Sequence, residues 1–124
     1  MQGNDAQFYY ATQRGKFRPG ELVRMDVTNH HRGYWSNAGR MAVIGEPSTE
    51  QATAYNNNLT LKAAAKEALR SAKRCREVFE AVQTTSQQKR IKFWEDVGVG
   101  HGVGTSDREP PYLKLVSIHK NRLL

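Results

Sequence analysis

Residues 19–47 read PGELVRMDVTNHHRGYWSNAGRMAVIGEP, and this stretch decides the fold class. Residues 21–28 alternate, so that every second side chain shares one face, which is typical of a β-strand. Residues 34–44 predict a second strand, bent near its middle, and the polar stretch between the two predicts a connection. We therefore expect an antiparallel hairpin with Asp26 near one end of the first strand and Asn37 across from it on the second.

The middle of the chain has helical patterns. Ser48 with Gln51 three residues later is a capping box, which predicts that a helix begins there. Apolar residues then recur at a spacing that can form one stripe: Ala52, Tyr55, Leu59, Ala63 and Ala65. A second set has the spacing i, i+3, i+4, i+7: Cys75, Val78, Phe79 and Val82. One helix or two fit these patterns, because residues 71–73 contain no Gly or Pro that would mark a break.

The two ends of the chain favour strands and loops. Residues 7–12 are aromatic and β-prone, and residues 112–118 have the composition of a strand. Residues 98–104 are rich in glycine, and residues 107–111 predict a polar loop that ends in two prolines. The prediction is a single α+β domain over residues 1–124, with an antiparallel sheet packed with one or two helices.

Composition limits the functional classes. The 124 residues suffice for one ordinary domain, and 38% apolar with 25% charged residues is typical of a globular protein. There is no apolar run of about 18 residues for a membrane span and no apolar signal-peptide core in the first twenty residues. The single cysteine, Cys75, excludes an internal disulfide and a multi-cysteine zinc site. We therefore expect a cytoplasmic protein with no membrane partner.

The formal net charge of +7 raises the question of nucleic acid as a partner. The sequence has no zinc finger, no RNP-like segment and no aromatic-rich basic motif. Many of the basic residues instead lie in the helical region, where a solvated helix face is the simpler interpretation: Lys62, Lys66, Arg70, Lys73, Arg74 and Arg76. Nucleic-acid binding is therefore not the favoured function.

Three sets of polar residues are candidates for chemistry. His101 lies between glycines, where an imidazole can face a cleft as a metal ligand or a proton carrier. Asp26 and Asn37 place two oxygen-bearing side chains on neighbouring strands, which a hard cation can use, although such residues are also common near turns. His30 and His31 are adjacent in the connection, where solvation is the simpler interpretation.

Two separated motifs carry a resemblance to a known family. The first comprises residues 19–28, then GYWSN at 33–37 with Arg40, then VIGEP at 43–47. The second is GHGVG at 100–104 followed by EPPYL at 109–113, which resembles the GHG(I/V)G…HEPPY signature. In this order, over about residues 7–115, they resemble the pita-bread metallopeptidases, which include methionine and Xaa-Pro aminopeptidases, prolidases and the metal-free creatinases. The resemblance implies a partial pita-bread fold and hydrolysis of peptide or C–N bonds.

The resemblance also implies a site. Family members hold two divalent metals with two aspartates, one histidine and two glutamates, and the metals activate a bridging water. Asp26 matches the first aspartate, Asn37 falls at the second, and His101 matches the histidine. Arg108 falls where a substrate-holding histidine stands in the family, and Glu109 follows it in the motif. The implied cofactor is Mn, Co or Zn, and the implied substrate is a peptide or small molecule.

Departures from the family pattern leave several interpretations open. Asn37 is neutral and cannot bridge two cations, and we expect both glutamates to lie beyond residue 124, which predicts a truncated relative or a fragment. The chain then fits an incomplete hydrolase, a non-catalytic binding module, or a metal-free creatinase-like enzyme in which His101 is the acid/base and Arg108 pairs with a substrate carboxylate. Because half of the fold would expose a sheet face, we also expect a homodimer or a complementing chain.

Overall fold

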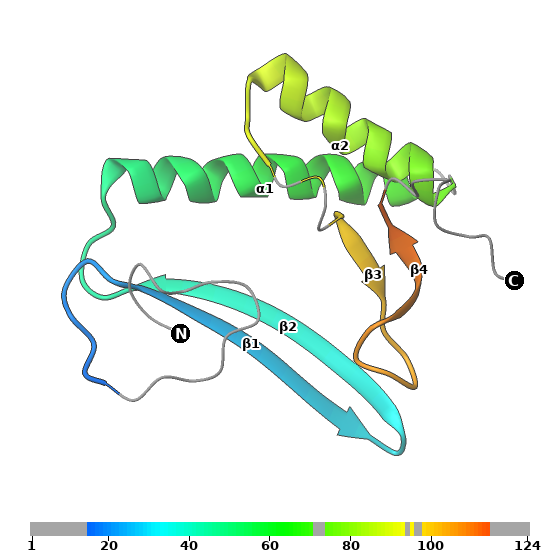
Figure 1. Ribbon diagram of the computed structural model, residues 1–124, viewed down its shortest axis with the longest axis horizontal. Coiled ribbons are helices and arrows are strands. Elements are labelled where there is room, and N and C mark those ends of the chain that lie inside the picture. Colours follow the sequence, from blue (N-terminus) through cyan, green and yellow to red (C-terminus); the bar gives the residue numbers. More distant parts are fainter. Residues whose placement is uncertain (1–14, 71–73, 94, 96–97, 115–124) are drawn as a thin grey trace, which may run out of the picture. The chain divides into compact units, whose positions relative to one another are not determined.

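The computed structural model describes residues 15–70, 74–93, 95 and 98–114. These residues form two compact units (Figure 1). Of the described residues, the first unit contains those from 15 to 55 together with 103–107, and the second contains those between 56 and 102 and between 108 and 114. Two two-stranded antiparallel sheets and two helices make up the described secondary structure, which confirms the expected α+β class.

The first unit is built around a long β-hairpin. Strands β1 (Leu22–His31) and β2 (Tyr34–Val43) pair antiparallel without a bulge. The turn consists of Arg32 and Gly33 alone, with φ of 51° and 84°. Positive φ at both turn residues is the geometry of a type I′ turn, which matches the right-handed twist of the strands, and glycine adopts it without a Cβ clash.

Two expectations about the hairpin, the length of its connection and the position of Asp26, were wrong in detail. The connection has two residues instead of five, because residues 29–31 continue the ladder and His31 pairs with Tyr34. The second strand runs unbroken through Ala38 and Gly39. Asp26 consequently lies near the middle of β1, opposite Gly39, and not near the end of the strand.

The capping box forms as expected where α1 (Thr49–Arg70) begins. The Ser48 backbone N–H donates to Gln51 Oε1 at 2.9 Å, and the Gln51 backbone N–H donates to Ser48 Oγ at 3.2 Å. The Gln51 side-chain amide also donates to the Gly20 carbonyl at 2.9 Å, and the Gly20 N–H donates to the Ile44 carbonyl at 2.8 Å. These bonds join the first turn of α1 to the open end of the hairpin.

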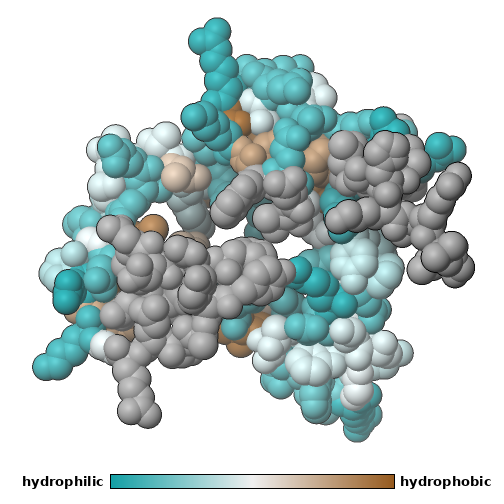
Figure 2. Space-filling model, viewed as in Figure 1, coloured by the Kyte–Doolittle hydropathy of each residue, from teal (hydrophilic) through white to brown (hydrophobic). Residues whose placement is uncertain are grey.

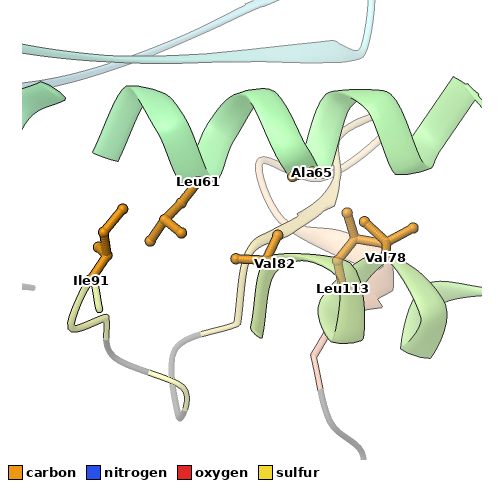
Figure 3. Packing of buried hydrophobic residues seen from close by; sticks show 6 residues of the cluster. All are labelled: Leu61, Ala65, Val78, Val82, Ile91 and Leu113. Atoms are coloured by element: carbon orange, nitrogen blue, oxygen red, sulfur yellow. The ribbon is translucent and has the colours of Figure 1, made fainter. Parts of the chain in front are cut away.

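The second unit contains the buried core (Figure 3). Helix α2 (Cys75–Lys89) contributes Val78, Phe79 and Val82, which are at most 1% exposed, so the apolar spacing predicted for this segment is confirmed. Burying each of these side chains stabilises the fold by about 1.5–3 kcal/mol. The ring of Phe79 also lies 6.0 Å from that of Phe93. Inside the core the Ser86 hydroxyl donates to the Ile91 carbonyl at 2.5 Å, so this buried polar group is satisfied.

The apolar stripe predicted for α1 was largely wrong. Leu61 and Ala65 are buried against the core, whereas Tyr55 and Leu59 are 54% and 45% exposed and Ala63 is exposed. Leu61 and Ala65 are spaced i, i+4 and point toward Val78, Val82 and Leu113 (Figure 3). The position of α2 and β4 therefore selects a different face of α1 from the one that the local pattern favours.

Strands β3 (Gly100–Gly102) and β4 (Glu109–Leu113) form the second sheet. The glycine-rich segment and the two prolines, expected as loops, therefore belong partly to strands. Prolines are tolerated in such a two-stranded sheet, because each strand keeps an unpaired edge. A Cβ at Gly102 would lie 2.6 Å from the Pro110 carbonyl oxygen, so the glycine permits close contact with β4 instead of close approach of a ligand.

Most of the coloured surface in Figure 2 is hydrophilic, with hydrophobic residues in small areas. Lys62, Lys66 and Arg76 are exposed, as a solvated helix face requires, and Arg76 forms an i, i+4 ion pair with Glu80 at 2.7 Å. Within the described residues, neither helix combines the length and apolar character of a membrane span. The strand expected at residues 7–12, the possible break at 71–73 and the strand end at 115–118 lie outside the described residues.

Candidate metal and substrate site

Asp26 already has a cationic partner. The Arg24 guanidinium Nη2 lies 3.0 Å from Asp26 Oδ2, and the two side chains are 22% and 49% exposed. Arg24 and Asp26 are two residues apart on one strand, so both side chains leave the same face of the hairpin. Gly39 stands opposite Asp26, so no side chain of β2 competes for the carboxylate from directly across the ladder.

Asn37 lies on the same face as Asp26. It pairs with Thr28, which stands two residues after Asp26 on β1, so Asp26 and Asn37 are diagonal neighbours. Diagonal residues in an antiparallel pair are about 7–8 Å apart, close enough for both side chains to reach one ligand. The hairpin thus places together the two candidates that the sequence indicated, but only Asp26 brings a negative charge.

His101 lies in β3 and pairs with Tyr112 of β4. Its side chain is half-buried, and Nδ1 is 2.8 Å from the Gly102 carbonyl oxygen. Because a carbonyl only accepts, Nδ1 carries the hydrogen in this contact. In the tautomer with its hydrogen on Nδ1, Nε2 carries the lone pair that a proton acceptor or a metal ligand uses.

Arg108 and Glu109 lie where β4 begins. Glu109 is the first residue of β4 and pairs with Gly102, next to His101 in the chain, while Arg108 is exposed immediately before it. The β3–β4 sheet thus carries His101 and Glu109 on paired strands and has Arg108 at its edge. Asp26 and Asn37 belong to the other compact unit, so the five candidates are described as two groups.

The described residues do not fit the dinuclear metal centre that the resemblance implies. Among them, no group of three His, Cys, Asp or Glu side chains is placed to hold a metal ion. On the hairpin the donor set is one carboxylate and one neutral amide, and the carboxylate is engaged by a guanidinium. A pair of divalent cations needs several anionic ligands, so these residues are insufficient for it.

Arg24 is the residue of this site that sequence reasoning missed. Its position was readable, because strand alternation places Leu22, Arg24, Asp26 and Thr28 on one face. A basic residue two positions from the candidate aspartate was therefore a signal of an ion pair.

Comparison with known proteins identifies relatives over most of the chain. The model of metallopeptidase family M24 matches residues 1–123. A probable dipeptidase PepE of Mycobacterium tuberculosis is 28% identical over 99 residues, which are 79% of this chain and 26% of that protein.

Solved structures agree with these sequence relatives. Prolidase from Thermococcus sibiricus superposes with a TM-score of 0.74 at 25% identity, over 91% of this chain and 31% of that one. Dipeptidase PepE from Mycobacterium ulcerans superposes with a TM-score of 0.70 at 26% identity, over 90% of this chain and 30% of that one. The likeness to prolidases confirms the expected partial pita-bread fold. The chain spans less than a third of the length of each of these relatives.

Proposed function

This chain belongs to metallopeptidase family M24, and we propose that it forms the part of a peptidase site that carries the histidine and binds the substrate. The proposed substrates are dipeptides or peptides with an Xaa-Pro bond, because the similar proteins are named as dipeptidases and a prolidase. The observation that carries the proposal is the β3–β4 sheet, which holds His101 and Glu109 on paired strands of the sequence motif GHGVG…EPPYL.

In this proposal each of the three side chains has a role that its chemistry allows. His101 uses Nε2 to take up and return a proton at the scissile bond, while the hydrogen bond from Nδ1 to the Gly102 carbonyl orients the ring. The Arg108 guanidinium pairs with the carboxylate of the peptide. Glu109 binds the positively charged amino end of the same substrate. A reducing cytoplasmic setting belongs to the proposal and rests on the cysteine content.

Family M24 generally depends on metal, but no step of the proposal passes through a metal ion, because the donor set of the hairpin is insufficient for the pair. The neutral Asn37 and the Arg24–Asp26 ion pair favour a second candidate function, a binding module that holds peptides without hydrolysing them. The peptidase and the binding module would both bind a peptide, but only the peptidase would hydrolyse it.

A complementing surface is also part of the proposal. The hairpin exposes large apolar side chains on both of its faces, among them Val27 at 57% exposure on one face and Met41 at 46% on the other. Exposed apolar surface of this kind is typical of an interface. We expect a second copy of the chain, or a complementing chain, to cover it. Light scattering that shows a stable monomer at micromolar concentration would contradict this expectation.

The peptidase proposal is tested by assaying the whole chain with Ala-Pro and Ala-Ala, and by following ligand binding through the His101 ring signals in NMR spectra. Hydrolysis that His101→Gln abolishes and His31→Gln leaves unchanged supports the peptidase. Binding without turnover, weakened by Arg108→Met, supports the binding module. If neither peptide binds or is cleaved with or without added Mn²⁺, both candidates are wrong.

A further inference from the structure

The charge balance around Asp26 is unusual for a cation site. Asp26 is the only acidic residue in β1 and β2, while the two strands contain two arginines, Arg24 and Arg40. Arg40 belongs to the opposite face, because it pairs with Met25, and its guanidinium donates to the Gly39 carbonyl at 2.7 Å. Arg24 alone shares the face of Asp26 and contacts its carboxylate.

We propose that the Arg24 guanidinium is the resident cation at Asp26 and excludes divalent metal from this face of the hairpin. The position that matches a metal-ligating aspartate of family M24 is thereby neutralised from within the same strand. The inference depends on the hairpin alone and holds whether or not the chain hydrolyses peptides.

The geometry gives the physical reason. A metal ion at Asp26 would have to take the carboxylate oxygen that lies 3.0 Å from Arg24 Nη2, and it would then stand beside a fixed positive charge. Arg24 is only 22% exposed, so water screens this repulsion less than it would at a fully exposed side chain. Asn37, the diagonal neighbour, offers a neutral oxygen and does not offset the repulsion.

The effect on affinity has a predictable size. A divalent ion at Asp26 is repelled by the nearby positive charge, and removal of that charge should strengthen metal binding about tenfold, which is about 1.4 kcal/mol. Removing the Arg24 charge should therefore strengthen metal binding about tenfold once the second carboxylate is present. Removing the equal charge of Arg40, which lies on the other face, should not strengthen metal binding.

The test is titration calorimetry of the whole chain with MnCl₂, using four proteins. These are the wild type, Asn37→Asp, Arg24→Met with Asn37→Asp, and the matched control Arg40→Met with Asn37→Asp. We expect no site-specific binding by the wild type. Arg24→Met with Asn37→Asp should bind about tenfold more tightly than Asn37→Asp and than the Arg40 control. Adding Asp26→Asn to the tight-binding variant should abolish the gain.

Several outcomes overturn the proposal. It fails if the wild type binds Mn²⁺ at Asp26, if the Arg24 variant binds no more tightly than Asn37→Asp, or if the Arg40 control gains as much as the Arg24 variant. Circular dichroism checks that each variant is folded. If Arg24→Met does not fold, Arg24→Gln replaces it, because glutamine keeps a hydrogen-bond donor but removes the charge. The proposal is then judged by the same outcomes for the Arg24→Gln variant.

Discussion

The two groups of candidate residues are held by interactions of different strength. Every residue of β1 and β2 is exposed or half-exposed, so Asp26 and Asn37 lie on a ribbon that is held by its ladder, its turn and hydrogen bonds near its two ends. His101 lies on a sheet whose second strand places Leu113 in the buried core with Val78 and Val82. A two-stranded hairpin alone is marginally stable in water. The histidine is therefore pre-positioned by packing, whereas the position of the aspartate depends on local interactions such as the Arg24–Asp26 pair.

The largest expected effect is on the packed region. Phe79→Ala removes a fully buried ring that also lies against Phe93, so we expect the free energy of unfolding to fall by about 3–5 kcal/mol. Urea denaturation followed by circular dichroism measures it. Leu59→Ala, at a 45% exposed position on α1, is the control and should cost much less. An equal loss in both variants would contradict a core confined to the buried cluster.

Gly102→Ala should have the next largest effect, because its Cβ would lie 2.6 Å from the Pro110 carbonyl and 2.9 Å from the Glu109 carbonyl. Backbone atoms cannot move aside as a flexible side chain does, so we expect a loss of about 2–3 kcal/mol and displaced His101 resonances. Gly39→Ala is the matched control in the hairpin, where the nearest atom is 4.0 Å away. If the two variants are equally stable, the close contact between β3 and β4 is wrong.

The smallest expected effect is at the turn of the hairpin. Gly33 has a φ of 84°, which an alanine adopts at a cost of about 1–2 kcal/mol. We expect Gly33→Ala to lower the hydrogen-exchange protection of the β1 and β2 amides while leaving α2 protected. If protection falls equally in α2, the hairpin and the packed region open as one cooperative unit, which would contradict the difference between them.

The local patterns predict the parts of the fold that local interactions decide. The alternation of residues 21–28, the capping box at Ser48 and the spacing of Val78, Phe79 and Val82 each have a short-range cause, and each appears in the structure. The buried face of α1 is different, because Leu61 and Ala65 are selected by helix α2 and strand β4, which lie far away in the sequence.

The sequence likewise indicated the candidate residues themselves but not the charged neighbour that contacts one of them. The hairpin pattern indicated Asp26 with Asn37, the flanking glycines indicated His101, and the family resemblance added Glu109. The ladders place Asp26 and Asn37, and His101 and Glu109, on neighbouring strands. The part of the aspartate side that the motif did not indicate is Arg24, because a motif marks matching positions and does not weigh the charge of the residues between them. Strand alternation supplies that information when it is combined with charge.

The most direct test of the account is the NMR spectrum of the wild-type chain during titration with paramagnetic Mn²⁺. We predict that the amide signals of Asp26, Asn37 and Gly39 broaden no more than those of helix α2, because Arg24 neutralises the carboxylate. Selective broadening of these three signals at substoichiometric Mn²⁺ would contradict the account and would place a metal ion at Asp26.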